Sequence, residues 1–340
     1  MPTAIFWPYR FDSIWGYWQK HFLRVSAALQ SFGFTIYKHP KIKGEIPGSI
    51  PYRGERSCDV VIYNHADLSD IRGDVIDAKH TWFLKPTIPD NEYATLDPLG
   101  YAAYSSITYK MPAFDSLSPT QEFKKCVEGW KKRRPDKWSS GFRNTTPSES
   151  DYHLIIGQCD GDATVRRQDF GRYIEKLKAV VRELSRVSDR PIVVKMHPFM
   201  NGFPVDRSTF AQDVAFDLAR ISPLVHCYTG KLSVHGFLPK ARDVLLANSG
   251  AGLEAMMYGK PIIAWGCPEY RWVCYDLRHL CDLWRATRLD WFDAERQNRF
   301  LFWYFRHYCI SDVKSAVHRI IALLQRREAA WSQPDSSRQT

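Results

Sequence analysis

The sequence predicts an α/β protein built from two Rossmann-like domains that face a central cleft. Three observations lead to this fold class. A chain of 340 residues has room for about two domains at roughly 150 residues each. An apolar content of 44% with 25% charged residues is ordinary globular usage and excludes a disordered or fibrous chain. In the second half, short apolar runs alternate with helical periodicities, as in parallel sheets covered by helices.

The first half predicts an N-terminal α/β domain over residues 1–138. It opens with an apolar run at 3–7 that predicts a strand. Apolar residues then recur at spacings of three and four, which define one face of a helix, at Trp18, Phe22, Val25 and Leu29. Further strands are expected at 34–37, 59–63 and 81–84, where β-branched and aromatic residues gather.

A change of composition separates the two halves. Between Lys124 and Lys137, seven residues are basic and two are acidic. Residues 139–151 are rich in Ser, Thr, Gly and Pro and show no apolar period. Such sequence is typical of connecting chain, so we predict that this region links the domains, with the linker proper at 139–151.

The second half predicts a C-terminal α/β domain over residues 152–311. Strands are expected at 152–156, 191–195, 224–227, 243–247 and 261–265, and helices at 170–184, 210–219 and 252–258. A closing helix at 312–330 and a flexible tail at 331–340 complete the chain. Ligands of open parallel sheets bind at the carboxyl ends of the strands, so the residues just after each strand are the candidates.

Charge and apolar content restrict the partners. A formal net charge of +10 favours phosphates, acidic glycans, nucleic acid or a membrane surface. The eight cysteines include no pair at the two-residue spacing of zinc and redox motifs. No run approaches the roughly 20 apolar residues of a membrane span, and the first residues lack the layout of a signal peptide. We therefore expect a cytoplasmic protein.

Two acidic residues follow the strand at 152–156. Asp160 and Asp162 lie on a glycine-containing loop, where a carboxylate can act as a general base or as a nucleophile on a sugar carbon. A calcium-like or turn-forming Asp-Gly pair is the alternative interpretation. After the strand at 191–195, Lys195 and His197 place a cation and an imidazole that can contact a phosphate, although a histidine before proline is often a turn residue.

A strand leads directly into a helix through Asn248-Ser249-Gly250. Exposed amides, the Ser249 hydroxyl and the positive end of the helix can hold a phosphate, and Glu254 is placed to accept hydrogen bonds from ribose hydroxyls. Small residues at such a turn can also serve packing alone. The spacing does not match the P-loop signature, which argues against an ATPase.

Five motifs in order carry a resemblance. The motifs are Gly157-Gln158 followed by Asp162, His197-Pro198, Asn248-Ser249-Gly250 with Glu254-Ala255, Gly259-Lys260-Pro261, and Gly266-x-Pro268-x-Tyr270. Over roughly residues 150–310 the chain resembles the bacterial capsule polysaccharide synthesis family, which includes β-Kdo transferases that use CMP-Kdo. The expected two-domain architecture is that of many glycosyltransferases, termed GT-B, in which the domain at 152–311 would bind the nucleotide-sugar donor and the domain at 1–138 the acceptor.

The resemblance implies a metal-independent glycosyltransferase without a cofactor, which moves Kdo from CMP-Kdo to a capsule, O-antigen or lipid-linked lipopolysaccharide acceptor. Asp162 matches the family's nucleophile in a retaining transfer, and His197 and Ser249 match its phosphate contacts. The same motifs are similar to bacterial sialyltransferases, in which the aspartate is a base and the reaction inverts. The outcome therefore stays open at this stage, as does the choice between Asp160 and Asp162.

The remaining expectations concern the sugar and the acceptor. Arg166 or Arg167 can pair with the Kdo carboxylate, or both can be solvated helix charges. An anionic glycan or glycolipid acceptor at the inner membrane gives the basic run 131–134 a docking role. The run 299–306 either lies in the headgroup layer or forms a buried helix between the domains. A transferase for UDP- or GDP-sugars and a non-catalytic protein that binds nucleic acid, another anionic polymer or a membrane are the alternatives, and no nucleic acid is expected.

Overall fold

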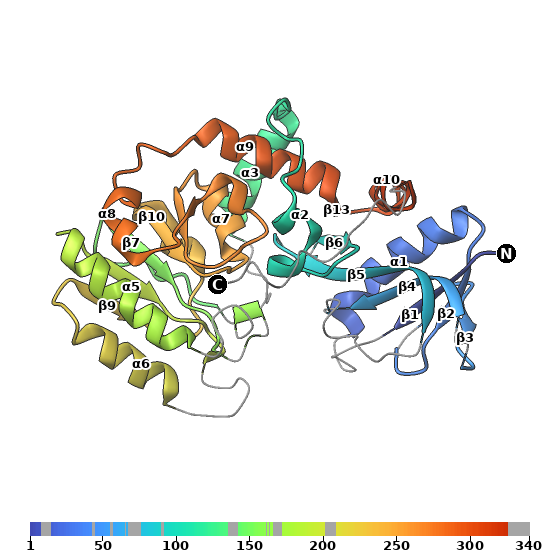
Figure 1. The fold of residues 1–340 in the computed structure, drawn as a ribbon, viewed down its shortest axis with the longest axis horizontal. Coiled ribbons are helices and arrows are strands. Elements are labelled where there is room, and N and C mark those ends of the chain that lie inside the picture. Colours follow the sequence, from blue (N-terminus) through green and yellow to red (C-terminus); the bar gives the residue numbers. More distant parts are fainter. Residues whose placement is uncertain are drawn as a thin grey trace.

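The computed structural model describes most of the chain in two lobes (Figure 1). The described residues are 1–7, 15–42, 45–54, 57–64, 66, 76–89, 92–134, 142–160, 162, 164–165, 172–200 and 209–325. Within them the strands form two sheets, one of seven strands and one of six. We call the seven-stranded sheet with its helices the first lobe and the six-stranded sheet with its helices the second lobe.

The first lobe has a mixed sheet with the order β13-β6-β5-β4-β1-β2-β3. Its strands are β1 (Thr3–Trp7), β2 (Thr35–Lys38), β3 (Ile50–Pro51), β4 (Ser57–Asn64), β5 (Asp77–Thr87), β6 (Tyr93–Asp97) and β13 (Cys309–Ile310). The pairs from β3 to β5 are parallel, while β6 is antiparallel to β5 and to β13. Helices α1 (Trp15–Ser31) and α10 (Val313–Leu324) lie side by side on one face, where apolar residues of both enter one core. The predicted strands and the first helix of this half are confirmed.

The second lobe has a fully parallel sheet with the order β12-β11-β10-β7-β8-β9. Its strands are β7 (Tyr152–Ile156), β8 (Ile192–Lys195), β9 (Val225–Tyr228), β10 (Ala241–Leu246), β11 (Ile262–Ala264) and β12 (Tyr275–Asp276). One core joins this sheet to α5 (Tyr173–Val187), α6 (Phe210–Ala219) and α8 (Leu283–Ala286). A second core on the other face joins it to α7 (Ala251–Met257) and α9 (Ala294–Trp303). Every predicted strand of this half is confirmed.

The basic region before the second lobe is helical. Residues Gln121–Arg133 form α3, after a short helix α2 (Ser106–Tyr109), and Phe123 and Trp130 of α3 are buried in the same core as α9. The interpretation of 124–137 as connecting chain is therefore wrong up to Arg133. The apolar residues of this segment form one face of a helix, although lysines surround them in the sequence. Residues 135–141 lie outside the described residues.

The described part of the predicted linker, residues 142–151, lies against the second lobe. Arg143 pairs through its backbone with Lys231 and Ser233, and Lys240 donates to the Pro147 carbonyl at 3.0 Å. The domain boundaries at 138 and 151 stay predictions, since the contacts of this segment do not define where one folding unit ends.

The chain returns to the first lobe near its end. After α9, a π-helical turn at Tyr304–Tyr308 leads into β13, so Cys309–Ile310 pair with β6, although the sequence placed them in the second domain. The Tyr308 hydroxyl donates to Asp97 at 2.7 Å, and the same carboxylate accepts from the Ser106 hydroxyl at 2.6 Å. Asp97 thereby joins both passages of the chain between the lobes.

The run 299–306 is largely buried. Phe300, Leu301, Tyr304 and Phe305 are at most 2% exposed, and Tyr304 hydrogen-bonds to Glu269 at 2.8 Å and lies 3.4 Å from the Thr87 hydroxyl. This confirms the buried helix between the two halves, because Thr87 belongs to β5 and Glu269 to the second lobe. In the described part of the chain, none of the helices combines the length and apolarity that crossing a bilayer requires.

Candidate active site

The candidate residues follow strands on either side of the point where the strand order reverses. From the central strand β7, the chain adds β8 and β9 on one side and β10 to β12 on the other. The loops after β7 and β10 diverge at such a point, and their separation leaves room for a ligand at the carboxyl edge. The sequence cannot give this strand order, but it does place the polar loops at that edge.

Two buried amides join the loops after β7 and β10. The Gln158 Nε2 donates to Asn248 Oδ1 at 2.7 Å, and the Asn248 backbone N–H donates to Gln158 Oε1 at 2.9 Å. The Asn248 Nδ2 also donates to the carbonyl of Thr164 at 3.2 Å. Since each buried polar group finds a partner, the two loops are held in one relative position.

Thr164 connects Asp162 to this amide pair by hydrogen bonds. The backbone N–H of Thr164 donates to Asp162 Oδ1 at 2.9 Å, and its hydroxyl donates to the same oxygen at 2.6 Å. Both hydrogen bonds fall on Oδ1 and orient the half-buried carboxylate. The turn-forming alternative is thus also present, because these bonds make an Asx turn. Asp160 lies in the same loop and is half-buried.

His197 lies against the loop that carries Asp162. Its Nδ1 accepts the Phe199 backbone N–H at 3.2 Å and lies 3.0 Å from the Cys159 sulfur. Burial, helped by the Asp162 carboxylate, raises the pKa of Cys159 to about 12, so its thiol is protonated at neutral pH and donates to Nδ1. A neutral ring with Nδ1 as acceptor carries its proton on Nε2.

Lys195 and Gly157 bring the ends of β7 and β8 together. Lys195 is the last residue of β8, is 6% exposed and lies in register with Ile156. The Gly157 N–H donates to the Lys195 carbonyl at 2.9 Å, and a Cβ at Gly157 would lie 3.3 Å from that oxygen. The close approach therefore favours glycine at this strand end.

Tyr270 holds the turn that contains Ser249. Its hydroxyl donates to the Ser249 carbonyl, and its buried ring lies so close to Gly252 that a Cβ at position 252 would overlap it. The Ser249 Oγ accepts the Ala251 N–H at 3.3 Å, just before α7 begins. Ser249 is half-buried and Gly250 exposed, so both are accessible from solvent.

Glu254 points to a buried histidine. Its Oε1 lies 3.5 Å from His235 Nε2, and His235 Nδ1 lies 3.1 Å from the Tyr258 hydroxyl. Glu254 is 6% exposed and His235 is 1% exposed. One carboxylate oxygen is therefore engaged inside the protein, which the sequence did not indicate.

The structure brings most of the predicted residues to one edge of the second sheet. The loops with Asp160 and Asp162, with Lys195 and His197, and with Asn248 to Gly250 are connected by the contacts above. Arg166 and Arg167 lie outside the described residues. Within the described residues, no cluster of three or more His, Cys, Asp or Glu side chains suited to a metal ion was found.

Sequence reasoning gave no role to Gln158 and Tyr270, and it indicated Thr164 only as a cap of the following helix. Gln158 and Tyr270 belong to the recognised motifs, and their positions after a strand and in Gly266-x-Pro268-x-Tyr270 are readable signals. The contact of Thr164 with Asp162 has no signal in the sequence, because it depends on the loop conformation.

The chain is similar to solved structures of other proteins. The chain is similar to the Thermosulfurimonas dismutans KpsC beta Kdo 2,4 transferase, with 17% sequence identity, 91% of each chain covered and a TM-score of 0.51. It is also similar to the KpsC beta Kdo 2,7 transferase of the same organism, with 14% identity, 96% of this chain and 100% of that chain covered and a TM-score of 0.47. The first likeness confirms the GT-B-like α/β fold. A comparison with curated protein sequences finds no match.

A family model described as capsule polysaccharide biosynthesis protein matches residues 92–308. The match begins in front of β6 and includes α2 and α3, so it starts well before the region in which the sequence motifs lie. It covers more than half of the chain and contains all three loops of the candidate site. The chain therefore belongs to the capsule polysaccharide biosynthesis protein family.

Proposed function

We propose that the chain is a glycosyltransferase that moves Kdo from CMP-Kdo to a capsule, O-antigen or other lipid-linked glycan. The observation that supports this most is the junction of the Asp162, His197 and Ser249 loops at the point of strand-order reversal. Family membership and the β-Kdo transferase activity named for the KpsC protein with the same fold support the substrate class.

On the donor side, the single phosphate of CMP needs positive potential and hydrogen-bond donors. His197 Nε2–H, the Ser249 hydroxyl and the Gly250 amide would donate to it, and Lys195 would supply charge from the adjacent strand end. Asn248, fixed by Gln158, would keep this loop in place. The second oxygen of Glu254 would accept from the ribose hydroxyls.

The transfer would proceed in two steps with retention. Oδ2 of Asp162 attacks the anomeric C2 of Kdo, the C2–O bond to CMP breaks, and CMP leaves with the bonding electron pair. An acceptor hydroxyl then attacks C2, loses its proton to a base, and releases the Asp162 carboxylate. The orientation of Asp162 by Thr164 supports this role, because both hydrogen bonds fall on the other oxygen. Arg166 or Arg167 would pair with the Kdo carboxylate.

The acceptor would be an anionic glycolipid at the cytoplasmic face of the inner membrane. Lys124, Lys125, Lys132, Arg133 and Arg134 are exposed on and just after α3. Basic side chains near a surface are attracted to anionic lipid and glycan, which supports a peripheral membrane association.

The test is incubation of the purified chain with CMP-Kdo and candidate acceptors. We expect release of CMP and a product heavier by one Kdo residue, with β configuration by NMR. A thermal-shift ranking of CMP, UDP and GDP separates a CMP-sugar enzyme from one that uses another nucleotide. Stabilisation by UDP or GDP alone, with no turnover of CMP-Kdo, would refute the proposed donor.

A further inference from the structure

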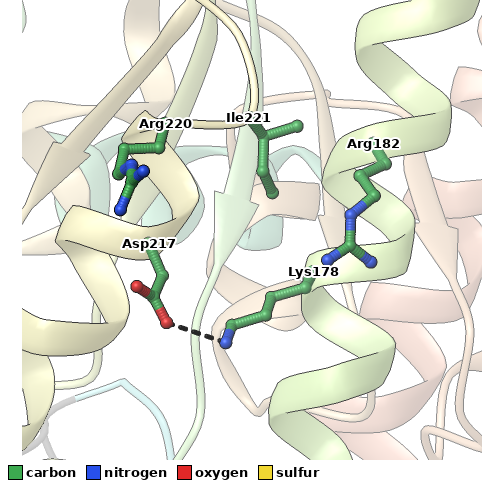
Figure 2. Close-up of a pocket in the computed structure, with 5 residues that line it drawn as sticks. All are labelled: Lys178, Arg182, Asp217, Arg220 and Ile221. Atoms are coloured by element: carbon green, nitrogen blue, oxygen red, sulfur yellow. Dashed lines mark hydrogen bonds and ion pairs between the residues drawn. The ribbon is translucent and has the colours of Figure 1, made fainter.

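A basic hollow lies between α5 and α6 on the outer side of the second lobe (Figure 2). Its lining comes from two helices and the turn after them: Lys178, Arg182, Asp217, Arg220 and Ile221. Arg182 comes from the α5 side and Arg220 from the α6 side, with Ile221 between them in the view. Three of the four charged residues are cations.

The hollow is separate from the candidate active site. The loop after β8 leads to α6, so α6 starts at the carboxyl edge of the sheet and runs back toward the opposite edge. Asp217 and Arg220 lie at its far end, away from the His197 loop. A ligand in the hollow is therefore not the sugar donor.

The acidic residue in the hollow is already neutralised. Lys178 Nζ donates to Asp217 Oδ2 at 2.9 Å, and Lys178, together with Arg220, lowers the pKa of Asp217. Lys178 Nζ also lies 3.9 Å from the exposed Glu175 carboxylate, and the two guanidinium groups still leave a net positive charge. Among the residues that the structure describes, neither Arg182 nor Arg220 has a side-chain hydrogen bond or ion pair to the protein.

The neighbouring aromatic ring is exposed as well. Phe216 is 64% exposed, and the guanidinium carbon of Arg220 lies 5.6 Å from its ring centroid. A cation over an aromatic face restricts the arginine side chain near the rim of the hollow. The charge is therefore partly preorganised.

We propose that this hollow binds a phosphate group, held between Arg182 and Arg220. A carboxylate is planar, and a single guanidinium can bind both of its oxygens from one side. A phosphate is tetrahedral, so its oxygens can accept hydrogen bonds from donors on several sides. Arg182 on α5 and Arg220 at the end of α6 approach from two sides and match the second geometry. The phosphate can be free inorganic phosphate or part of a lipid headgroup, and the site does not depend on the proposed transfer reaction.

The test compares the full chain with Arg182→Gln/Arg220→Gln and with the matched control Arg285→Gln, which removes an exposed charge on α8. Inorganic phosphate is titrated by calorimetry at low salt, and the difference between the wild type and the double variant isolates the hollow from phosphate bound at any other site. Vesicles of phosphatidylcholine with and without phosphatidylglycerol are tested by co-sedimentation. Circular dichroism and thermal unfolding verify that each variant is folded.

We expect the double variant to bind phosphate about fivefold or more weakly than the wild type, and the control variant to match the wild type. The same loss on phosphatidylglycerol vesicles, with weak binding of inorganic phosphate, identifies a lipid headgroup. A loss for inorganic phosphate alone identifies the free ion. Equal binding by the double variant and the control, or no binding by the wild type in either assay, overturns the proposal.

Discussion

The side chains of Gln158 and Asn248 are hydrogen-bonded to each other across the point where the strand order of the second sheet reverses. The Gln158 amide donates to the Asn248 side chain at 2.7 Å and accepts the Asn248 backbone N–H at 2.9 Å. Neither residue is more than 6% exposed. Together with the hydrogen bond from Asn248 to the Thr164 carbonyl, the pair fixes the spacing of the two loops.

Replacement of Gln158 by Ala should destabilise the protein by about 2 kcal/mol, because it leaves the Asn248 N–H and Oδ1 buried without these partners. Urea unfolding measures the change. Gln121→Ala at the exposed start of α3 is the matched control and should alter the free energy of unfolding by less than about 0.5 kcal/mol. Equal stability of the two variants would contradict the structural role of the pair.

Replacement of Asp162 by Asn should lower kcat about 1,000-fold or more and change the Kd for CMP less than about threefold. The Asn side chain keeps an oxygen for Thr164 but cannot form the sugar ester. Asp160→Asn is the control within the same loop and should retain activity within about tenfold. Inactivation by the Asp160 change, with Asp162→Asn still active, would assign the chemistry to Asp160.

Replacement of Gly252 by Ala should displace the Tyr270 ring and cost about 2 kcal/mol or more in the free energy of unfolding. The Ser249 carbonyl would lose its hydrogen bond from Tyr270, so CMP should bind more weakly as well. Gly129→Ala, in the middle of α3 with open space around it, should be neutral or stabilising by up to about 1 kcal/mol. A fully stable Gly252→Ala protein would show that Tyr270 does not constrain this turn.

The buried thiol of Cys159 should make the protein less stable in alkali. Its pKa is about 12 in the fold and 9.0 without the protein environment, so above pH 9 the unfolded chain releases a proton that the folded chain keeps. Stability from this group is complete below pH 9 and is lost as the pH rises toward 12. Cys159→Ser should flatten the pH dependence of unfolding by up to about 1.4 kcal/mol per pH unit. The exposed Cys281→Ser is the control, and identical slopes for both variants would refute this assignment.

Replacement of Glu254 by Ala should raise KM for the donor about tenfold with kcat within about threefold, if one carboxylate oxygen binds the ribose while the other faces His235. Steady-state kinetics at varied donor concentration separate the two constants. A fall in thermal stability with unchanged KM would mean that Glu254 serves His235 alone.

Much of the second lobe could be predicted because its strands are short and apolar. The sequence predicts β7 and α6 with the bounds that the structure has. The contribution of β13 could not be predicted, since its two residues pair with a strand more than 200 positions earlier. In α3, the apolar spacing of Phe123, Cys126, Val127 and Trp130 is helical, but the surrounding lysines suggested connecting chain.

The residues of the candidate site could be predicted from the sequence, but the contacts between them could not. Asp162, His197 and Ser249 could be selected because each closely follows a buried strand. The contacts that hold these residues in place could not be predicted. They depend on Thr164, which binds Asp162, and on Tyr270, which lies 21 positions after Ser249. Side-chain contacts between separate loops depend on strand order, which no local pattern encodes.

The Asp97 carboxylate also has a mechanical consequence. It ties the outgoing passage of the chain, through Ser106, to the returning passage, through Tyr308. The two covalent connections between the lobes therefore run next to each other at Asp97. A change in the relative position of the lobes would therefore have to move Ser106 and Tyr308 together, or break a hydrogen bond to a buried carboxylate.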